Sequence, residues 1–425
     1  MDRDTALASQ DPGSPADDLV LFQKVRSSTE RLARPLTAED QQIQSMPDAS
    51  PTKWHLAHTT WFFEEFILAR DRHYVPFHPQ FRFLFNSYYE AVGARHPRPQ
   101  RGLLSRPSLS EVMAYRGHVT DAMSKMIRIS NDPQVASLLT LGIAHEEQHQ
   151  ELVLMDAKHA LSINPLQPAY RSDLAEAASS AVTSLRYIAF DCGLHEIGHD
   201  GQGFAFDNEG PRHKVWVDGF RLADRLVTCG EYRDFIADGG YRDPRWWLSD
   251  GWATVQAQGW QAPLYWRTDG DEWSLFTLGG RRRLIDSEPV CHVSFYEAAA
   301  YAKWAGKRLP TEFEWEVASR SVSVVGNFVD SDALHPSAAA ADSGPRQMFG
   351  DVWEWTASAY GPYPGFREPA GAIGEYNGKF MSSQMVLRGG AAVTAARHIR
   401  PTYRNFFPPA ARWPFGGIRL AEDAT

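Results

Sequence analysis

Hydrophobic positions recur at helical spacing through about the first 165 residues. The stretch 16–34 carries apolar side chains every three or four positions, which predicts a helix with one buried face. Three further helices are predicted, each opened by residues that favour helix N-termini: Ser50 before Pro51, Ser108 with Glu111 three positions later, and Asp132 before Pro133. They extend to about Ala69, Ile129 and Leu161. Four long helices with apolar stripes predict a four-helix bundle.

The pattern changes beyond residue 165. Residues 163–183 hold two prolines followed by small polar residues, which is typical of a linker. Farther on, glycine and proline are frequent and the strands are short, as in KVWVDGFRL, and we expect only two helices, near 228–238 and 295–306. The pattern predicts an α+β multidomain protein. Its expected parts are a disordered tail over 1–17, the bundle over 18–165, a linker over 166–185 and a loop-rich α+β domain over 186–425.

Composition narrows the class of protein. The net charge of -9 argues against non-specific binding to nucleic acid, so no nucleic-acid partner is expected. We expect no membrane association, because no apolar run of about 18 residues occurs and the N-terminus is acidic and polar, unlike a signal peptide. The cysteines, Cys192, Cys229 and Cys291, lack metal-binding spacing and favour a reducing, cytoplasmic location. Nothing in the sequence indicates an oligomeric state.

Two histidines on the fourth predicted helix are candidate metal ligands. His145 and His149 are four residues apart, so both imidazoles lie on one helix face and can reach one ion. The same letters, HEEQH, satisfy the H-E-x-x-H pattern of zinc peptidases, in which Glu146 would be the general base. The extended peptidase motif fails, because Leu152 and Met155 stand at its glycine and histidine positions. Two histidines that hold no metal are a third possibility.

A third ligand is expected from the second predicted helix. His58 lies among apolar residues there and is preferred, while His55, three positions earlier, is the rival ligand. A buried histidine without a metal is the other interpretation of His58. Three neutral imidazoles leave open positions on an ion, which suits Fe(II) that must hold substrates and O2 together, whereas a structural zinc site is closed by a fourth ligand.

These motifs resemble a known family. LAH (56–58) with HEEQH (145–149) is similar to the iron-binding pattern of the sulfoxide synthases of ergothioneine biosynthesis. The second half resembles the formylglycine-generating-enzyme domain in five strings: FAFDNEGPRHKVWVDGF (204–220), PVCHVSFYEAAAYAKWAGKRLPTEFEWEVASR (289–320), FGDVWEWT (349–356), VLRGG (386–390) and GIRLA (417–421). The resemblance implies a DinB-like four-helix bundle followed by a C-type-lectin-like domain. Formylglycine formation itself is not expected, because Leu420 stands where those enzymes carry a cysteine.

The resemblance also implies a reaction and a set of site residues. Fe(II) would be held by His58, His145 and His149, and hercynine (N-alpha-trimethylhistidine), a thiol and O2 would combine to a sulfoxide with a new C–S bond. Gln148 and Asn405 match positions that contact hercynine. Phe406 and Phe407 would face the trimethylammonium group or the sulfur substrate, or be core aromatics. Arg98 and Arg101, in HPRPQRGLL, match arginines that bind the carboxylate of the sulfur donor.

Two tyrosines distinguish branches of that family. NSYYEAVG (86–93) is similar to the branch that uses free cysteine, which makes Tyr88 and Tyr89 the candidate donors of a proton or hydrogen atom and L-cysteine the expected substrate. The branch that uses gamma-glutamylcysteine carries a tyrosine near the position of Ile373, and Tyr376 resembles a second tyrosine of that branch. Gamma-glutamylcysteine as donor and a 5-histidylcysteine sulfoxide synthase remain alternatives. So do a zinc metallopeptidase and a non-enzymatic, lectin-like binding module.

Overall fold

The chain folds into two compact units. The computed structural model describes residues 14–174, 182, 184–270, 272–340 and 344–424. One unit comprises Met1–Pro165, Asp200–Asp207 and Arg367–Lys379, and the other comprises Leu166–His199, Asn208–Phe366 and Phe380–Thr425. The expected division assigned 200–207 and 367–379 to the second domain, but both segments belong to the first unit. These segments bond to residues of the first unit that lie far away in the sequence. Glu375, for example, accepts hydrogen bonds from the backbone N–H groups of Glu90 and Ala91.

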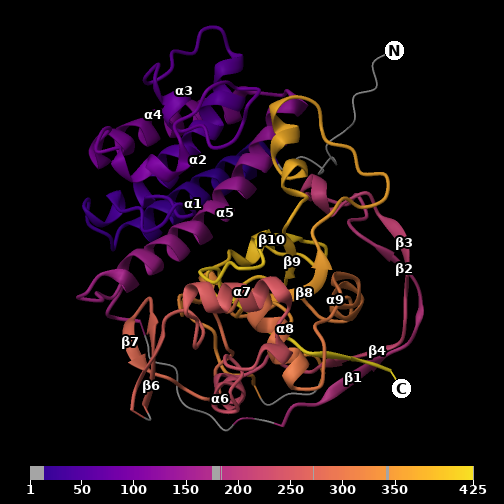
Figure 1. Ribbon diagram of the computed structural model, residues 1–425. Helices are drawn as coiled ribbons and strands as arrows, with labels where there is room; N and C mark the ends of the chain where they lie inside the picture. Colours follow the sequence, from indigo (N-terminus) through magenta and orange to yellow (C-terminus); the bar gives the residue numbers. More distant parts are fainter. Residues whose placement is uncertain (1–13, 175–181, 183, 271, 341–343, 425) are drawn as a thin grey trace. The chain divides into compact units, whose positions relative to one another are not determined.

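Four long helices form the first unit (Figure 1): α1 (Pro15–Ala33), α2 (Thr52–Phe66), α4 (Leu109–Ile129) and α5 (Pro133–Ile163). Helices α1 and α2 each pack against both α4 and α5, which gives the predicted four-helix bundle. Apolar side chains fill its interior, among them Phe22, Phe62, Phe63, Val112, Val119, Met123 and Leu154. The chain between α2 and α4 contains α3 (Phe81–Leu84) and a 3-10 helix, η3 (Arg98–Leu103).

The helix starts agree with two of the three N-terminal signals in the sequence. Ser108 and Glu111 form a complete capping box on α4, and Asp132 caps α5. Helix α2 begins one residue later than expected, with Pro51 at its N-cap. The Ser50 hydroxyl, expected to cap the helix, instead accepts a hydrogen bond from Arg101 at 2.9 Å. Helix α1 begins at Pro15 with Ser14 as its N-cap, one residue before the predicted helix over 16–34, so the last residues of the predicted tail, 1–17, are helical. Residues 1–13 of that predicted tail lie outside the described residues.

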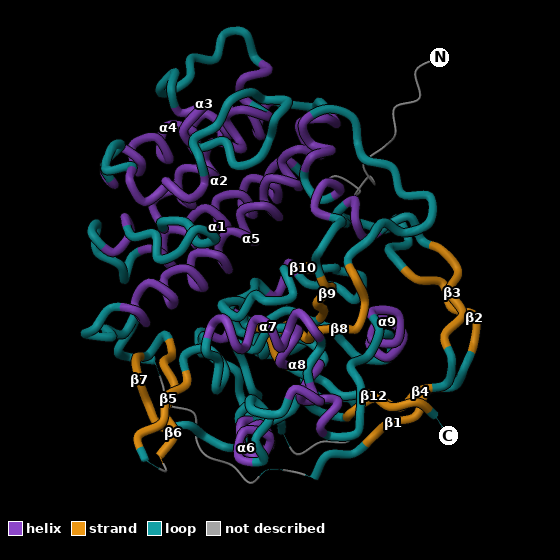
Figure 2. The backbone as a smooth tube through the Cα atoms, in the orientation of Figure 1, coloured by secondary structure: helices purple, strands orange, loops and turns teal. Residues whose placement is uncertain are grey.

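The second unit is built from short strands and long loops (Figure 2). Two sheets have three strands: β1 (Tyr187–Phe190), β4 (Phe220–Ala223) and β12 (Ala421–Asp423), and β5 (Trp266–Asp269), β6 (Glu272–Thr277) and β7 (Gly280–Arg283). A four-stranded sheet has the order β10 (Asn405–Phe407), β9 (Met385–Arg388), β8 (Trp353–Ala359), β11 (Gly416–Gly417). Strands β2 (Gly193–Ile197) and β3 (His213–Val217) form a two-stranded ribbon. This mixed unit confirms the expected α+β class.

The second unit has more helix than the sequence pattern indicated. The two expected helices are present as α6 (Cys229–Ala237) and α8 (Phe295–Trp304). The expectation of only two was wrong, because α7 (Ser249–Gln258) and α9 (Glu312–Ser319) also form. Helix α9 carries a capping box between Thr311 and Glu314, which stabilises so short a helix. Helix α7 has no side-chain cap and ends at Gly259 in the left-handed conformation.

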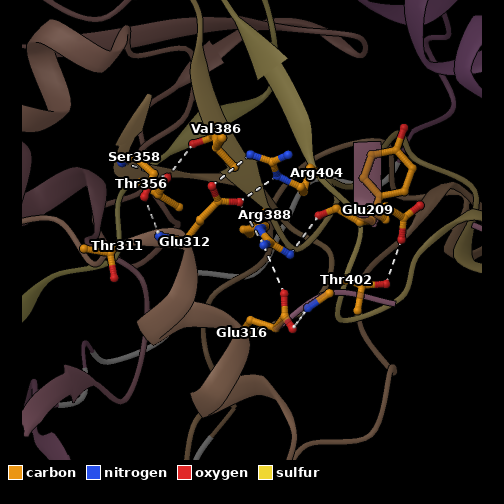
Figure 3. Close-up of polar contacts among 12 residues, drawn as sticks. Glu209, Thr311, Glu312, Glu316, Thr356, Ser358, Val386, Arg388, Thr402 and Arg404 are labelled. Carbon is orange, nitrogen blue, oxygen red and sulfur yellow. Dashed lines mark hydrogen bonds and ion pairs between the residues drawn. The ribbon is translucent and has the colours of Figure 1, made fainter. Parts of the chain in front are cut away.

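A buried group of charges holds the centre of the second unit together (Figure 3). Arg388 of VLRGG donates to Glu312 at 3.0 Å and to Glu316 at 3.2 Å, and Arg404 bonds both carboxylate oxygens of Glu312. All four side chains are at least 96% buried. Each buried charge thus has an opposite charge bonded to it, and the loss of one partner would leave another charge buried without compensation.

The predicted linker, 166–185, is described only in part, because residues 175–181 and 183 lie outside the described residues. Its first half is fixed to the second unit: the Arg171 N–H donates to the carbonyl of Leu278 at 3.1 Å, and Arg171 pairs with Asp332 at 2.7 Å. Within the described ranges, no helix combines the length and the apolar content needed to cross a lipid bilayer.

Candidate active site

Three histidines converge inside the first unit. His58 comes from α2, and His145 and His149 come from α5. One ring nitrogen of each lies within 4.8 Å of the others, and all three side chains are buried. The Nε2 atoms of His58 and His145 are 3.2 Å apart. Two nitrogens that each lie about 2.1 Å from one ion, roughly at right angles, are separated by about 3 Å, so this spacing fits a bound metal.

A glycine brings the two helices close enough for this convergence. Gly142 lies on α5, one turn before His145, and faces the buried rings of Phe62 and Phe63 on α2. A Cβ at position 142 would lie 2.5 Å from Cε1 of Phe63, which is closer than carbon atoms can approach. Any larger residue would therefore force the Phe62 and Phe63 rings of α2 to shift, next to the candidate ligands.

Hydrogen bonds fix which ring nitrogens face the centre. Nδ1 of His58 lies 2.6 Å from the carbonyl oxygen of Phe85, and a carbonyl only accepts, so this nitrogen carries the proton and Nε2 keeps its lone pair. Nδ1 of His149 lies 2.8 Å from Nδ1 of His55, which directs Nε2 of His149 to the centre. These two histidines are therefore oriented before any ion binds, whereas Nδ1 of His145 is buried without a hydrogen-bond partner among the described residues.

The three imidazoles are neutral at ordinary pH. Burial lowers the pKa of His145 to about 3. Burial and the neighbouring histidine rings hold the pKa values of His58 and His149 well below the usual value for histidine. The neutral imidazole is the form that binds a metal. The three imidazoles can therefore bind a cation without first losing a proton.

Glu146 faces away from the histidines. Its carboxylate accepts from Arg26 at 3.0 Å, from Arg116 at 2.5 Å and from Thr29 at 2.7 Å. Burial alone would raise the pKa of Glu146, but the charges of Arg116 and Arg26 lower it to about 2. A carboxylate fully engaged by α1 and α4 cannot activate water at the metal group, which contradicts the zinc-peptidase interpretation of HEEQH.

A stack of planar groups leads from the histidines to Arg101. The Trp54 indole stacks on the His58 ring with centroids 4.6 Å apart, and the Arg101 guanidinium lies 3.4 Å from the centroid of Trp54. Arg101 is buried and bonds the hydroxyls of Ser50 and Ser87. Burial and the nearby charge of Arg98 hold the pKa of Arg101 well below its usual value. Within the described residues this cation has no carboxylate bonded to it, which favours the binding of an anion.

Arg98 differs from Arg101 in its surroundings. It begins η3 with an exposed side chain that donates to the backbone carbonyl of Asp48. The two arginines predicted as a pair are thus a buried one and an exposed one.

The predicted tyrosines lie on the loop after α3. Tyr88 is partly exposed and Tyr89 is buried, and their rings stack with centroids 4.6 Å apart. Burial raises the pKa of both phenols, and Tyr88 and Tyr376 raise that of Tyr89 further. Both phenols therefore keep their protons at neutral pH.

Sequence reasoning missed Tyr376 as a site residue. Its ring lies 5.7 Å from that of His145, and its hydroxyl donates to Oε1 of Gln148, the residue before His149. Phe206 stacks on the other side of Tyr376, with centroids 5.5 Å apart. The string GEYNGKF, compared with the gamma-glutamylcysteine branch, was the only signal available for this residue.

The remaining predicted residues, Asn405, Phe406 and Phe407, belong to the second unit. They form β10, in which Asn405 lies opposite Leu387 of β9. Phe406 stacks on Tyr360 with centroids 4.1 Å apart, and Phe407 meets the edge of Trp413. Phe406 and Phe407 thus pack against aromatic rings of that unit, and Oδ1 of Asn405 accepts the backbone N–H of Phe406 at 2.9 Å.

Comparisons with known proteins agree with this architecture. Residues 21–160 match the DinB superfamily, and residues 175–343 and 336–424 match the sulfatase-modifying factor enzyme 1-like domain. Hercynine oxygenase from Mycolicibacterium thermoresistibile is 33% identical over 95% of this chain and 94% of its own. Hercynine oxygenase from Mycolicibacterium smegmatis is 33% identical over 96% of this chain and 98% of its own. Ergothioneine biosynthesis protein 1 from Schizosaccharomyces pombe is 29% identical over 55% of this chain and 29% of its own. The chain is an enzyme that belongs to the hercynine oxygenase family.

Proposed function

We propose that this protein is a non-heme Fe(II) sulfoxide synthase that joins hercynine to free L-cysteine. The overall reaction consumes hercynine, cysteine and O2 and yields hercynyl-cysteine sulfoxide and one water. The imidazole loses a C–H bond and cysteine loses its S–H bond, and O2 accepts the four electrons. A thiol substrate agrees with a reducing, cytoplasmic location.

The convergence of three neutral histidines is the observation that carries this proposal. The potential ligand group contains no cysteine and no carboxylate among the described residues, so the donor set has no net charge and leaves positions for substrates. His58, His145 and His149 would hold Fe(II). Bound iron would supply the redox chemistry that O2 requires, while the protein binds and orients the substrates.

Arg101 is the proposed anchor for the carboxylate of cysteine. Its guanidinium is buried, bonded only to hydroxyls among its hydrogen-bond partners, and stacked on Trp54 against His58. An anion bound to Arg101 would be separated from His58 by the indole ring of Trp54. Arg98 would add a weaker, screened attraction from its exposed position.

Gln148 is the proposed contact for hercynine, oriented by its hydrogen bond from Tyr376. Asn405 would contact hercynine as well, and Phe406 and Phe407 would face its trimethylammonium group. Tyr88 and Tyr89, each protonated at its phenol oxygen, are the proposed donors of a proton or hydrogen atom to the reacting centre. The position of Tyr376 supports a second candidate, in which gamma-glutamylcysteine is the sulfur donor, since this tyrosine resembles one of that branch.

The test is reconstitution with Fe(II) without air, followed by O2 with hercynine and either L-cysteine or gamma-glutamylcysteine, with products identified by mass. A sulfoxide formed more efficiently from cysteine would support the proposal. A preference for gamma-glutamylcysteine would keep the reaction and change the donor. Plain histidine in place of hercynine tests the 5-histidylcysteine alternative. If no O2-dependent product forms with any pair, the proposed function is wrong.

A further inference from the structure

His55 is a buried histidine that stays outside the candidate ligand group. It lies on α2, one turn before His58, and is 2% exposed. Its two ring nitrogens have different partners. Nδ1 lies 2.8 Å from Nδ1 of His149, and Nε2 lies 3.0 Å from Oδ2 of Asp156. His55 therefore connects a carboxylate on α5 to the side of His149 that faces away from the centre.

Asp156 is itself held in place by the backbone. It lies two turns beyond His149 on α5 and is 5% exposed. The same oxygen that faces His55, Oδ2, accepts the backbone N–H of Ser50 at 2.8 Å. Ser50 also bonds Arg101 through its hydroxyl. The carboxylate is thus fixed at the point where the chain enters α2.

The direction of the hydrogen bonds follows from this arrangement. A carboxylate only accepts, so Nε2 of His55 is the nitrogen that carries a proton, and Nδ1 of His55 serves as the acceptor. Between the two facing Nδ1 atoms, the proton must then come from His149. A neutral imidazole with its proton on Nδ1 offers Nε2 as its only lone pair. Asp156 thereby sets the tautomer of His149 through His55.

We propose that His55 and Asp156 are positioning residues that keep His149 in its metal-binding tautomer and orientation. The inference rests on the proposed metal centre and adds a role for two residues that bind neither metal nor substrate. Ligand histidines in general depend on such partners, and loss of the partner weakens metal binding about 10- to 100-fold. The pair also explains why His55, the rival ligand by sequence, is buried without joining the ligand group.

The test measures binding of Fe(II) without air, by competition with a chelator, and the visible absorption spectrum of the Co(II)-loaded protein. Neither readout needs hercynine, cysteine or turnover. His55→Phe removes the acceptor for His149 and should weaken Fe(II) binding about 10- to 100-fold and change the Co(II) spectrum. His55→Gln restores an acceptor oxygen and should recover most of the affinity. The matched control is His398→Phe, because His398 is also a buried histidine but lies in the second unit, where it bonds Tyr403.

Asp156→Asn provides a second variant that changes less volume. An amide oxygen can still accept from Ser50 and His55 but lacks the charge, so Fe(II) binding should weaken by less, about 5-fold. Equal Fe(II) affinity and an unchanged Co(II) spectrum in His55→Phe and Asp156→Asn, with normal binding by the wild type, would overturn the positioning role alone. If His55→Phe does not fold, an unchanged result for His55→Gln together with Asp156→Asn would do the same. A wild-type protein that binds no divalent metal overturns the proposed centre itself.

Discussion

The hydroxyl of Tyr376 donates a hydrogen bond to the amide oxygen of Gln148, a residue 228 positions earlier in the chain. Gln148 lies directly before His149, so the bond ties the segment Arg367–Lys379 to the helix that supplies two of the candidate ligands. Phe206 supports the other face of the tyrosine ring. A predicted binding residue is therefore oriented by a side chain from a distant part of the sequence.

This relationship predicts the effect of Tyr376→Phe. Loss of one neutral hydrogen bond should free the Gln148 amide and raise the KM for hercynine about 2- to 10-fold, with a smaller effect on the KM for cysteine. Steady-state kinetics with each substrate varied in turn measures the difference. Tyr74→Phe is the control, because its hydroxyl bonds Glu64 elsewhere in the first unit. Equal changes in both KM values would argue against a specific link to hercynine.

Tyr88→Phe and Tyr89→Phe test the proposed donors. Removal of the protonated phenol should lower the rate of sulfoxide formation and divert turnover towards cysteine sulfinate, because the competing oxidation of the thiol needs no donor at that position. The ratio of sulfoxide to sulfinate, measured by mass at equal O2 consumption, reports the change. Unchanged rates and product ratios in both single variants and in the double variant would refute this role.

Arg101→Met tests the carboxylate anchor. A charge-assisted hydrogen bond contributes about 1.5–3 kcal/mol, so the KM for cysteine should rise about 10- to 100-fold while the KM for hercynine changes little. Arg98→Met, at the exposed position, should have a much smaller effect. Cysteamine, which lacks the carboxylate, should be a poor substrate for the wild type. Its kcat/KM should fall little further in Arg101→Met. A rise in both KM values alike would point to a general disturbance of the Trp54–His58 stack.

Glu312 predicts a pH dependence of stability in the second unit. Burial alone would raise the pKa of this carboxyl, but the charges of Arg404 and Arg388 lower it below its usual value. A carboxyl whose pKa is lower in the folded state stabilises the fold above its unfolded pKa, about 4.3, and loses that contribution as the pH falls through the folded value. Glu312→Gln should therefore lower the free energy of unfolding by about 3–5 kcal/mol at pH 7, because it leaves buried guanidinium groups uncompensated.

The difference between the wild type and Glu312→Gln should start to shrink below about pH 4.3, where this carboxyl binds a proton in the unfolded chain but not yet in the folded one, and should disappear once the folded carboxyl is protonated too. Denaturant titrations at several pH values measure it. Glu39→Gln, an exposed position, should leave the free energy of unfolding almost unchanged across the same range. A difference that stays constant on acidification would show that this carboxylate makes no pH-dependent contribution.

Much of the first unit could be predicted because its signals are local. Helical periodicity and the Asp132 and Ser108 caps predicted α4 and α5, and the i, i+4 spacing predicted one face for His145 and His149. The start of α2 could not be predicted, because the Ser50 hydroxyl accepts from Arg101, 51 positions away, instead of capping the helix. The place of Tyr376 depends on a long-range return of the chain for which no periodicity exists. Helix α9 could have been predicted, since Thr311 and Glu314 have capping-box spacing.

Because the segment Arg367–Lys379 belongs to the first unit, a change late in the chain alters the surroundings of residues early in the chain. Glu375 holds the backbone of the Tyr88–Tyr89 loop, and Tyr376 holds Gln148, although both are encoded more than 200 positions after that loop. A cut after residue 165 would leave the bundle without these supports. Conversely, an exchange of everything after that point with a relative would replace the neighbours of the tyrosines and leave all three histidines untouched. Recombination at a single position would thus exchange the supports of the Tyr88–Tyr89 loop and of Gln148 while keeping all three candidate ligand histidines.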